Sequence, residues 1–257
     1  MDKVSDLKEN YDDKEWDLRV KLAATYRIFD HLGWTSLIFN HITLRIPGPD
    51  HCFLINPFGL RYDEVKASNL VKVDASGKKI KDLNYQNWDI NEAGFTIHSA
   101  IHKNVQDAIC IMHTHTPAGL AVACKTSGLI NTNIYSSMIF DYISYHDFEG
   151  VALRSEEQER LLDSIGSNPL LILRNHGLLA TGRTIEEAFV RLWTLQMACE
   201  TQLLTESMLG TTIPITSAAT EFNVKEVRLF EDVPRERDKS FDALLRIIDA
   251  KDPSYKE

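Results

Sequence analysis

The chain has 257 residues, of which 44% are hydrophobic and 25% are charged, and its formal net charge at pH 7 is −9. This composition is typical of a globular protein with a sizeable core and excludes a mainly disordered chain. No segment reaches the roughly 18–20 consecutive apolar residues of a membrane span, and no Lys/Arg block offsets the acidic balance, so we expect neither membranes nor nucleic acids as partners.

The first part of the chain predicts one helix followed by short strands. Apolar residues recur at helical spacing from Glu15 to Leu32, and Gly33 follows as a C-terminal stop. Alternating apolar and polar residues then predict three strands separated by turns, over residues 40–46, 52–55 and 70–73. The Pro/Gly break at residues 47–50 makes the first two strands a β-hairpin.

From Ala93 onward, helices alternate with strands. Helical patterns, some opened by a capping box or an early proline, cover residues 93–102, 116–124, 155–165 and 184–209. Continuous apolar runs at 108–112 and 170–173 predict strands that are covered on both faces. Past Gly210 the pattern weakens, and we expect the polar tail Lys251–Glu257 to be loose. The alternation indicates a layered α/β domain, and the early hairpin favours a mixed sheet.

Two features indicate the cellular compartment. Residues 1–16 are charged and lack the apolar core of a signal peptide. The four cysteines lie far apart without a C-x-x-C pair, which disfavours a disulfide framework and a thiolate zinc site. They are Cys52, Cys110, Cys124 and Cys199. We therefore expect a cytoplasmic protein with reduced thiols.

A pair of histidines, His113 and His115, follows directly on the buried run at 108–112. Side chains two residues apart on a strand point to the same face, so these two rings can converge on one ion. Neutral imidazole is a ligand for zinc and neighbouring divalent transition metals. The alternative is a pair of hydrogen-bonded core or rim histidines, because an H-x-H pattern often occurs by chance.

A third histidine, His176, follows the second buried run in an equivalent position. If the two strands were neighbours, His176 would complete a three-histidine site with an open coordination position, and Gly177 would let the backbone turn closely behind it. His98 and His102 lie one helical turn apart, but without an adjacent catalytic glutamate a packing role is favoured. The other histidines of interest, His31, His41, His51 and His146, are interpreted as surface or structural residues.

Several blocks in fixed order resemble the class II aldolase/adducin family. They are Phe39–Ile42, Leu54–Leu60, Asn91–Ile101, His113–Gly119, Leu171–Leu178, Glu186–Phe189 and Ala198–Gln202. The resemblance extends over roughly residues 17–209, and the adducin-like branch is more similar than the sugar-phosphate aldolase branch. We therefore interpret residues 1–257 as a single domain of this kind, with a C-terminal extension over residues 210–257.

The resemblance implies a fold, an assembly and a cofactor. The fold is a three-layer α/β/α domain with a mixed, largely antiparallel central sheet, and the assembly is a homotetramer with its active site at a subunit junction. Three histidines hold a divalent ion, Zn²⁺ in the first place and otherwise Mn²⁺, Fe²⁺ or Co²⁺. Matched by motif, these ligands are His113, His115 and His176. The ion polarises a substrate carbonyl and stabilises an enolate.

The chain also departs from the family pattern. The catalytic glutamate of the aldolases corresponds to Gly94, which has no side chain to move a proton. Glu92 is a possible replacement, or it caps the helix that starts near Ala93, and Tyr135 is a second candidate for proton delivery. The phosphate-binding threonine and serines correspond to Phe58, Glu92 and Ala93, which disfavours a phosphorylated substrate. Asn40, Asn56 and Gly59 remain as substrate-binding candidates, although turn geometry alone can explain such residues.

Three functional hypotheses follow from this pattern. The first is a metal-dependent lyase, for aldol cleavage or decarboxylation, that acts on a non-phosphorylated carbonyl or carboxylate small molecule. The second is a non-catalytic module like the adducin head, which oligomerises or binds the cytoskeleton (actin) and retains a metal site. Gly94 supports this second hypothesis, whereas the intact histidine set opposes it. The third is a metal site that only stabilises the fold.

Overall fold

A seven-stranded mixed sheet forms the centre of the computed structural model, which describes residues 8, 11–48, 51–80, 88–150, 155–231 and 233–257. The strand order is β3-β2-β1-β4-β7-β6-β5, and only the β5–β6 pair is parallel among the pairs described. The strands are β1 (His41–Arg45), β2 (Phe53–Ile55), β3 (Val71–Val73), β4 (Cys110–Thr114), β5 (Ile143–His146), β6 (Leu170–Leu173) and β7 (Gly177–Gly182). The prediction of a mixed, largely antiparallel sheet is confirmed.

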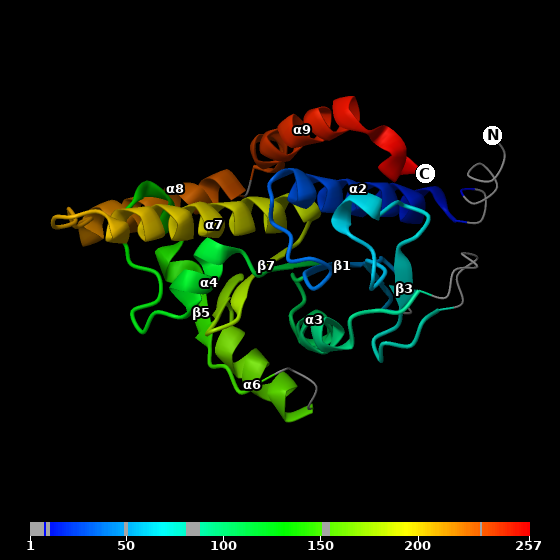
Figure 1. The fold of residues 1–257 in the computed structure, drawn as a ribbon, viewed down its shortest axis with the longest axis horizontal. Coiled ribbons are helices and arrows are strands. Elements are labelled where there is room, and N and C mark those ends of the chain that lie inside the picture. Colours follow the sequence, from blue (N-terminus) through cyan, green and yellow to red (C-terminus); the bar gives the residue numbers. More distant parts are fainter. Residues whose placement is uncertain (1–7, 9–10, 49–50, 81–87, 151–154, 232) are drawn as a thin grey trace.

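Helices cover both faces of the sheet, which confirms the three-layer arrangement (Figure 1). One layer contains α2, α7 and α9, with α4 and α5 packed against α7 and with α8 packed against α5 and α9. The other layer contains α3 and α6. The helices are α2 (Asp13–His31), α3 (Glu92–Asn104), α4 (Pro117–Ala123), α5 (Ile134–Ile139), α6 (Ser155–Ile165), α7 (Ile185–Ser207), α8 (Ser217–Glu231) and α9 (Pro234–Lys251). Short 3-10 turns are η1 (Tyr62–Glu64), η2 (Phe140–Tyr142) and η3 (Pro253–Lys256). Among the described helices, none has the length and apolar content that a membrane span needs.

The central strands are apolar on both faces because both faces are covered. In β4, Cys110 and Met112 pack into the core beneath α2 and α7, whereas Ile111 packs against α3 and α6. His113 follows Ile111 at a spacing of two and therefore points toward the α3 side of the sheet. This alternation places the first histidine of the H-x-H pair in the smaller, α3-facing core.

The sheet contains two strands that the sequence pattern did not indicate, β5 and β7. The sequence pattern indicated no strand between His176 and the helix at 184, yet β7 occupies that stretch and lies between β4 and β6. The run Leu170–Leu173, which is β6, is therefore separated from β4 by β7, whereas the three-histidine hypothesis took these two strands as neighbours. His176 still reaches β4, because it lies in the turn that joins β6 to β7.

The C-terminal region is more ordered than its composition suggests, and the expectation of a loose tail is wrong. Two helices, α8 and α9, follow α7, and the terminal residues dock on the N-terminal part of the chain. Tyr255 is buried, and the backbone N–H groups of Ala67 and Ser68 donate to the carbonyls of Tyr255 and Glu257 over 2.8 and 2.9 Å. One aromatic anchor and two backbone hydrogen bonds therefore hold a segment that is polar on average.

Some predicted details lie outside the described residues. They are residues 49–50 of the Pro/Gly break and the side chains of Ser155 and Glu156, the first two residues of the capping box predicted there. The cap predicted for the helix that starts at residue 184 is present. The Glu187 backbone N–H donates to Thr184 Oγ1 over 3.2 Å at the start of α7.

Candidate metal centre

His113 is held at the end of β4 by a backbone carbonyl. Its Nδ1 lies 2.9 Å from the carbonyl oxygen of Leu178, on the paired strand β7. A carbonyl only accepts hydrogen bonds, so Nδ1 carries the ring proton and donates it. The lone pair of this neutral ring is consequently on Nε2, which is the usual arrangement for a histidine that binds a metal.

His176 lies in a tight three-residue turn between β6 and β7. The turn has Asn175 in the left-handed region at φ 57°, and the His176 backbone N–H donates to the Leu173 carbonyl over 3.0 Å. The Asn175 N–H donates to the Ala123 carbonyl at the end of α4, over 3.1 Å, which fixes the turn against its neighbour. Asparagine is among the few non-glycine residues that adopt this conformation easily.

Gly177 allows the close approach behind the site that its position suggested. A Cβ atom at this residue would lie 2.3 Å from the Thr114 carbonyl oxygen and 3.1 Å from the His115 ring. Any side chain here would therefore push β7 away from the end of β4. The glycine brings the His176 turn next to the H-x-H pair.

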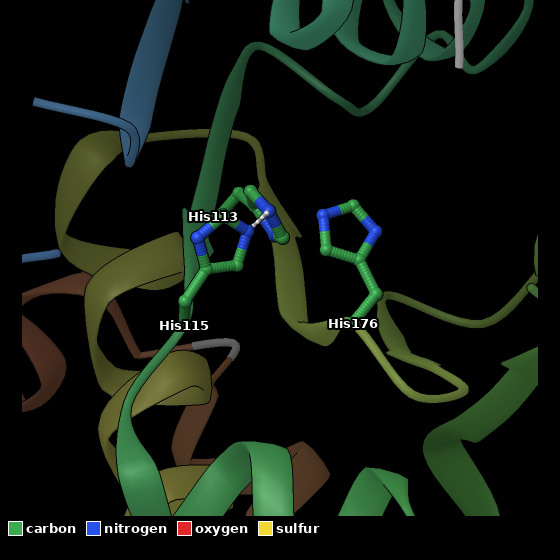
Figure 2. Close-up of side chains that lie close together, drawn as sticks. All are labelled: His113, His115 and His176. Atoms are coloured by element: carbon green, nitrogen blue, oxygen red, sulfur yellow. Dashed lines mark hydrogen bonds between the residues drawn. The ribbon is translucent and has the colours of Figure 1, made fainter. Parts of the chain in front are cut away.

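The three rings of His113, His115 and His176 face one another (Figure 2). One ligand nitrogen from each ring can be chosen so that all three lie within 4.8 Å of one another. The ring centroids are 4.5, 4.8 and 4.9 Å apart, and the Nε2 atoms of His113 and His115 are separated by 2.7 Å. Residues far apart in the sequence thus form one compact cluster.

Burial keeps all three imidazoles neutral near pH 7. Desolvation is the largest cause in each case: it lowers the pKa of His113 well below its usual value, lowers the pKa of His115, and lowers that of His176 to about 4. The neighbouring rings add to the effect at His113 and His176, because a positive charge on one disfavours a charge on the next. Neutral rings have the lone pairs that a metal requires.

The donor set fits a divalent transition metal. Three neutral imidazoles with space for a further ligand are typical of catalytic zinc. In a tetrahedral site with metal–nitrogen bonds of about 2.0–2.1 Å, ligand nitrogens lie about 3.3 Å apart. The 2.7 Å between the two Nε2 atoms is shorter, because the Nε2–H of His115 donates to His113, whose own proton is on Nδ1.

Two of the predicted substrate-binding residues, Asn40 and Asn56, make hydrogen bonds within the fold. Asn40 is buried; its Oδ1 accepts from the backbone N–H of His115 over 3.1 Å, and its Nδ2 donates to the Trp34 carbonyl over 2.9 Å. Asn56 Oδ1 accepts from the Tyr26 hydroxyl over 2.9 Å. Asn40 therefore fixes the backbone of a candidate ligand, whereas Asn56 connects to the α2 side of the core.

The remaining predicted residues lie at more exposed positions. Glu92 is the exposed first residue of α3, and it borders a groove together with Lys78 and Lys79. Tyr135 packs edge-on against Trp193 of α7, with ring centroids 5.6 Å apart. Gly59 has φ 107° in the turn after β2, with open space around it, so backbone conformation alone calls for glycine there.

Sequence reasoning missed a second group of polar residues beside the cluster. His41 on β1 is directly opposite His113 on β4, and their ring centroids are 5.0 Å apart. Thr43, His98 and His102 continue from His41 in a line of hydrogen bonds beneath the sheet. The available signals were weak: His41 and Thr43 share one face of a strand, and His98 and His102 share one face of a helix. Nothing in the sequence alone aligned those two faces.

Comparison with known proteins decides the family. The sequence profile of the class II aldolase and adducin N-terminal domain matches residues 20–203. The chain belongs to the class II aldolase and adducin family. Its membership agrees with the resemblance found in the ordered motifs, including the adducin-like character, because both aldolase-named and adducin-named relatives match.

Three similar proteins illustrate how closely the chain resembles differently named members of this family. A Pseudomonas aeruginosa protein named provisionally as an aldolase class 2 protein is 48% identical over 203 residues, 79% of this chain and 77% of that protein. Mouse alpha-adducin is 44% identical over 212 residues, which cover 80% of this chain but 29% of that protein. The solved structure of an L-fuculose 1-phosphate aldolase from Glaciozyma antarctica has a TM-score of 0.82 at 28% identity, over 95% of this chain and 93% of that one.

Proposed function

We propose that this chain is a metal-dependent carbon–carbon lyase that acts on a non-phosphorylated carbonyl or carboxylate compound. The observation that carries the proposal is the convergence of His113, His115 and His176, whose ligand nitrogens lie within 4.8 Å of one another. Membership of the class II aldolase and adducin family supports the same reaction class.

The protein residues hold and orient the reacting groups. His113, His115 and His176 would hold the ion, most favourably Zn²⁺, with Mn²⁺, Fe²⁺ or Co²⁺ as alternatives. When bound, such an ion supplies a Lewis acid for a substrate carbonyl or carboxylate oxygen. The Leu178 carbonyl orients His113, and Asn40 holds the backbone of His115, so the geometry is set before a substrate arrives.

The surroundings favour a substrate without a phosphate group. Phe58 offers an aromatic ring where the aldolases of the family use a hydroxyl, and Glu92 offers a carboxylate where they use a serine. A carboxylate about 4 Å from a phosphate would repel each of its charges by about 1–4 kcal/mol, depending on the local dielectric. The Glaciozyma neighbour, named for a phosphorylated sugar, thus matches in fold and differs here in the proposed specificity.

Proton transfer and substrate contacts remain part of the proposal. Glu92 and Tyr135 are candidates for proton transfer, and Asn40, Asn56 and Gly59 are candidates for shaping the substrate pocket. Tyr135 would act across the junction with a neighbouring copy in a homotetramer, the assembly that the family resemblance implies.

A second candidate function is a non-catalytic oligomerising or actin-binding module like the adducin head. The match to alpha-adducin and the glycine at position 94 favour it. The three converging histidines are not needed for such a role unless the ion only stabilises the fold.

A turnover assay distinguishes the two functions. The zinc-loaded chain is screened against non-phosphorylated β-hydroxy carbonyl and β-keto acid compounds, and against phosphorylated ketoses and aldoses. The double variant His113→Ala/His115→Ala is the inactive control, and His31→Ala, at an exposed residue at the end of α2, is the matched control that retains activity. We expect cleavage only in the first group. Efficient cleavage of a phosphorylated sugar would overturn the substrate class, and no cleavage at all would favour the module.

A further inference from the structure

We propose that His41 is a substrate-binding residue whose Nε2 accepts a hydrogen bond from a hydroxyl group, so that the substrate is a β-hydroxy carbonyl compound. This inference deepens the lyase function proposed above and rests on it. It is carried by a line of buried hydrogen bonds that runs from His41 to a backbone carbonyl, and by the position of the His41 ring.

The line contains four side chains from β1 and α3. His41 Nδ1 lies 3.1 Å from His98 Nε2, and His98 Nδ1 lies 2.7 Å from Thr43 Oγ1. Thr43 Oγ1 is also 2.7 Å from His102 Nε2, and His102 Nδ1 ends the line 2.7 Å from the Ala108 carbonyl oxygen. Each contact has the length of a good hydrogen bond.

The carbonyl sets the direction of every bond in the line. The Ala108 oxygen only accepts, so His102 Nδ1 donates and His102 Nε2 is an acceptor. The Thr43 hydroxyl must then give its one proton to His102, which leaves its oxygen to accept from His98 Nδ1. His98 Nε2 is in turn an acceptor, and His41 Nδ1 donates to it.

This chain of donors leaves a lone pair on His41 Nε2. The three rings are buried, and among the described residues no carboxylate is hydrogen-bonded to any of them, so each ring is neutral. A neutral ring that donates through Nδ1 accepts through Nε2. His41 therefore presents an acceptor and has no proton to offer at that atom.

The Nε2 edge of His41 occupies the place that a side chain at position 94 would fill. A Cβ atom on Gly94 would lie 2.2 Å from both His41 Nε2 and Cδ2, so any residue other than glycine would displace the ring. Position 94 corresponds to the catalytic glutamate of the family's aldolases. The same ring is next to His113, with centroids 5.0 Å apart. An imidazole from β1 thus lies where a carboxylate side chain on α3 would otherwise begin.

The Nε2 atom of His41 also borders accessible space. Among the described residues it has no hydrogen-bond partner, yet it is not one of the fully enclosed atoms without a partner, which are Tyr62 Oη and Thr114 Oγ1. A buried ring with one open, unpaired acceptor beside a candidate ligand is suited to bind a donor group of the substrate.

The acceptor distinguishes between the two lyase reactions. In aldol cleavage the substrate has a hydroxyl on the carbon β to its carbonyl; the bond between the α and β carbons breaks, the hydroxyl oxygen loses its proton and the α carbon gains one. Such a hydroxyl can donate to His41 Nε2. A β-keto acid that loses carbon dioxide presents only oxygen lone pairs, which repel the lone pair on Nε2. The fixed proton positions therefore favour aldol cleavage.

Neutron diffraction from crystals of the zinc-loaded full chain tests the proton positions independently of activity. We expect deuterium on Nδ1 of His41, His98 and His102, and none on His41 Nε2. Deuterium on His41 Nε2, or a bond from that atom to the metal, would overturn the inference even if the protein cleaves a substrate.

Binding of a matched pair of probes tests the substrate class. The probes are 4-hydroxy-2-oxopentanoate and 2-oxopentanoate, which differ by the β-hydroxyl, with dissociation constants taken by stopped-flow fluorescence before turnover. We expect the hydroxyl compound to bind the zinc-loaded protein about tenfold more tightly, because its loss leaves the acceptor unpaired. Equal binding, or binding of neither, would overturn the substrate class.

A pair of variants connects the preference to the line. Thr43→Val removes the hydroxyl that directs both histidines, and Thr43→Ser retains it. The preference should fall below about threefold in Thr43→Val and recover in Thr43→Ser; an unchanged preference in a folded Thr43→Val would contradict the role of the line. If Thr43→Val does not fold, the neutron and probe results on the unmodified chain still decide. Failure of the lyase function would be seen separately: the protein would still bind the hydroxyl probe more tightly than 2-oxopentanoate but would release no cleavage products.

Discussion

The two histidine groups in this molecule use the same side chain for opposite purposes. In the convergent group, His113, His115 and His176, the ring nitrogens face one another, and two Nε2 atoms lie 2.7 Å apart. In the linear group, His41, His98 and His102, each described contact joins one nitrogen to the next partner until the line ends at a carbonyl. Converging ring nitrogens form a candidate cation site, whereas hydrogen bonds made one after another give the linear group a fixed direction.

Backbone carbonyls and solvent access explain the difference. Each group has one histidine anchored through Nδ1 by a carbonyl, that of Leu178 for His113 and that of Ala108 for His102. His98 is fully buried between β1 and α3, whereas His115, after the end of β4, and His176, in the β6–β7 turn, are partly exposed. An ion from solvent can therefore reach the convergent group, whereas the linear group ends at the His41 ring beside His113.

The largest expected effect is loss of metal from the convergent group. The variant His113→Ala/His115→Ala should retain no stoichiometric zinc after purification without chelators, because two of three ligands are missing. The unmodified chain and the matched variant His31→Ala should each retain about one ion per chain. Elemental analysis by mass spectrometry checks this. Zinc retained at full occupancy by the double variant would show that these residues do not form the metal site.

Breaking the linear group should cost stability and leave the metal in place. Thr43→Val leaves His98 Nδ1 and His102 Nε2 without partners in a buried setting. We expect a loss of about 2–4 kcal/mol in the free energy of unfolding, from about 1–2 kcal/mol for each unpaired group. Thr43→Ser should lose far less. Denaturant unfolding measures the loss of stability, and elemental analysis of the same samples measures the zinc content. Loss of zinc from folded Thr43→Val would show that metal binding by the convergent group depends on the linear group.

The linear group should also make the fold sensitive to acid. Burial lowers the pKa of His102 to about 3, whereas histidine in an unfolded chain titrates near about 6.5. Between these values the unfolded chain binds more protons, so stability falls as the pH falls, by about 1.4 kcal/mol per pH unit for this residue.

The variant His102→Gln isolates this contribution, because glutamine can donate to the Ala108 carbonyl and accept from Thr43 without titrating. Its free energy of unfolding should decline less steeply from pH 6 to pH 4, by about 1.4 kcal/mol per pH unit. His31→Gln, at an exposed position, serves as the control. Parallel declines in His102→Gln and the unmodified chain would mean that His102 does not contribute.

The smallest expected effect concerns Glu92, outside both groups. As the exposed first residue of α3 it lies where a negative charge stabilises a helix N-terminus, so Glu92→Gln should cost about 0.3–1 kcal/mol of stability. Asp107→Asn, outside the helices, is the surface control. A loss of turnover of a hundredfold or more in Glu92→Gln, at unchanged zinc content, would instead show that Glu92 is the proton-transfer residue and not only a helix cap.

Local patterns in the sequence were sufficient for most helices and for the two buried strands next to the histidines. The periods of 3.6 and 2 depend only on nearby residues, and they located α2, α3, α7, β4 and β6 to within a few residues of their observed bounds. The strands β5 and β7 have no such signature. β7 has glycines at both ends, and its place between β4 and β6 depends on hydrogen bonds across the sheet.

The candidate site was only partly accessible to the same reasoning. Motif order selected His113, His115 and His176, and the structure brings these three rings together. His41 could not be selected, because its relevance depends on the β1–β4 register and on the Gly94 backbone, which is close in space and distant in sequence. The docking of Tyr255 was missed for a related reason, since a single buried aromatic residue does not change the average polarity of a tail.

Anomalous X-ray diffraction at the zinc edge, from crystals of the unmodified chain grown without chelators, tests the central claim most directly. We predict one anomalous peak per chain within about 2.0–2.1 Å of a ring nitrogen of each of His113, His115 and His176. A peak elsewhere, or none at zinc, manganese, iron or cobalt edges, would contradict the metal centre.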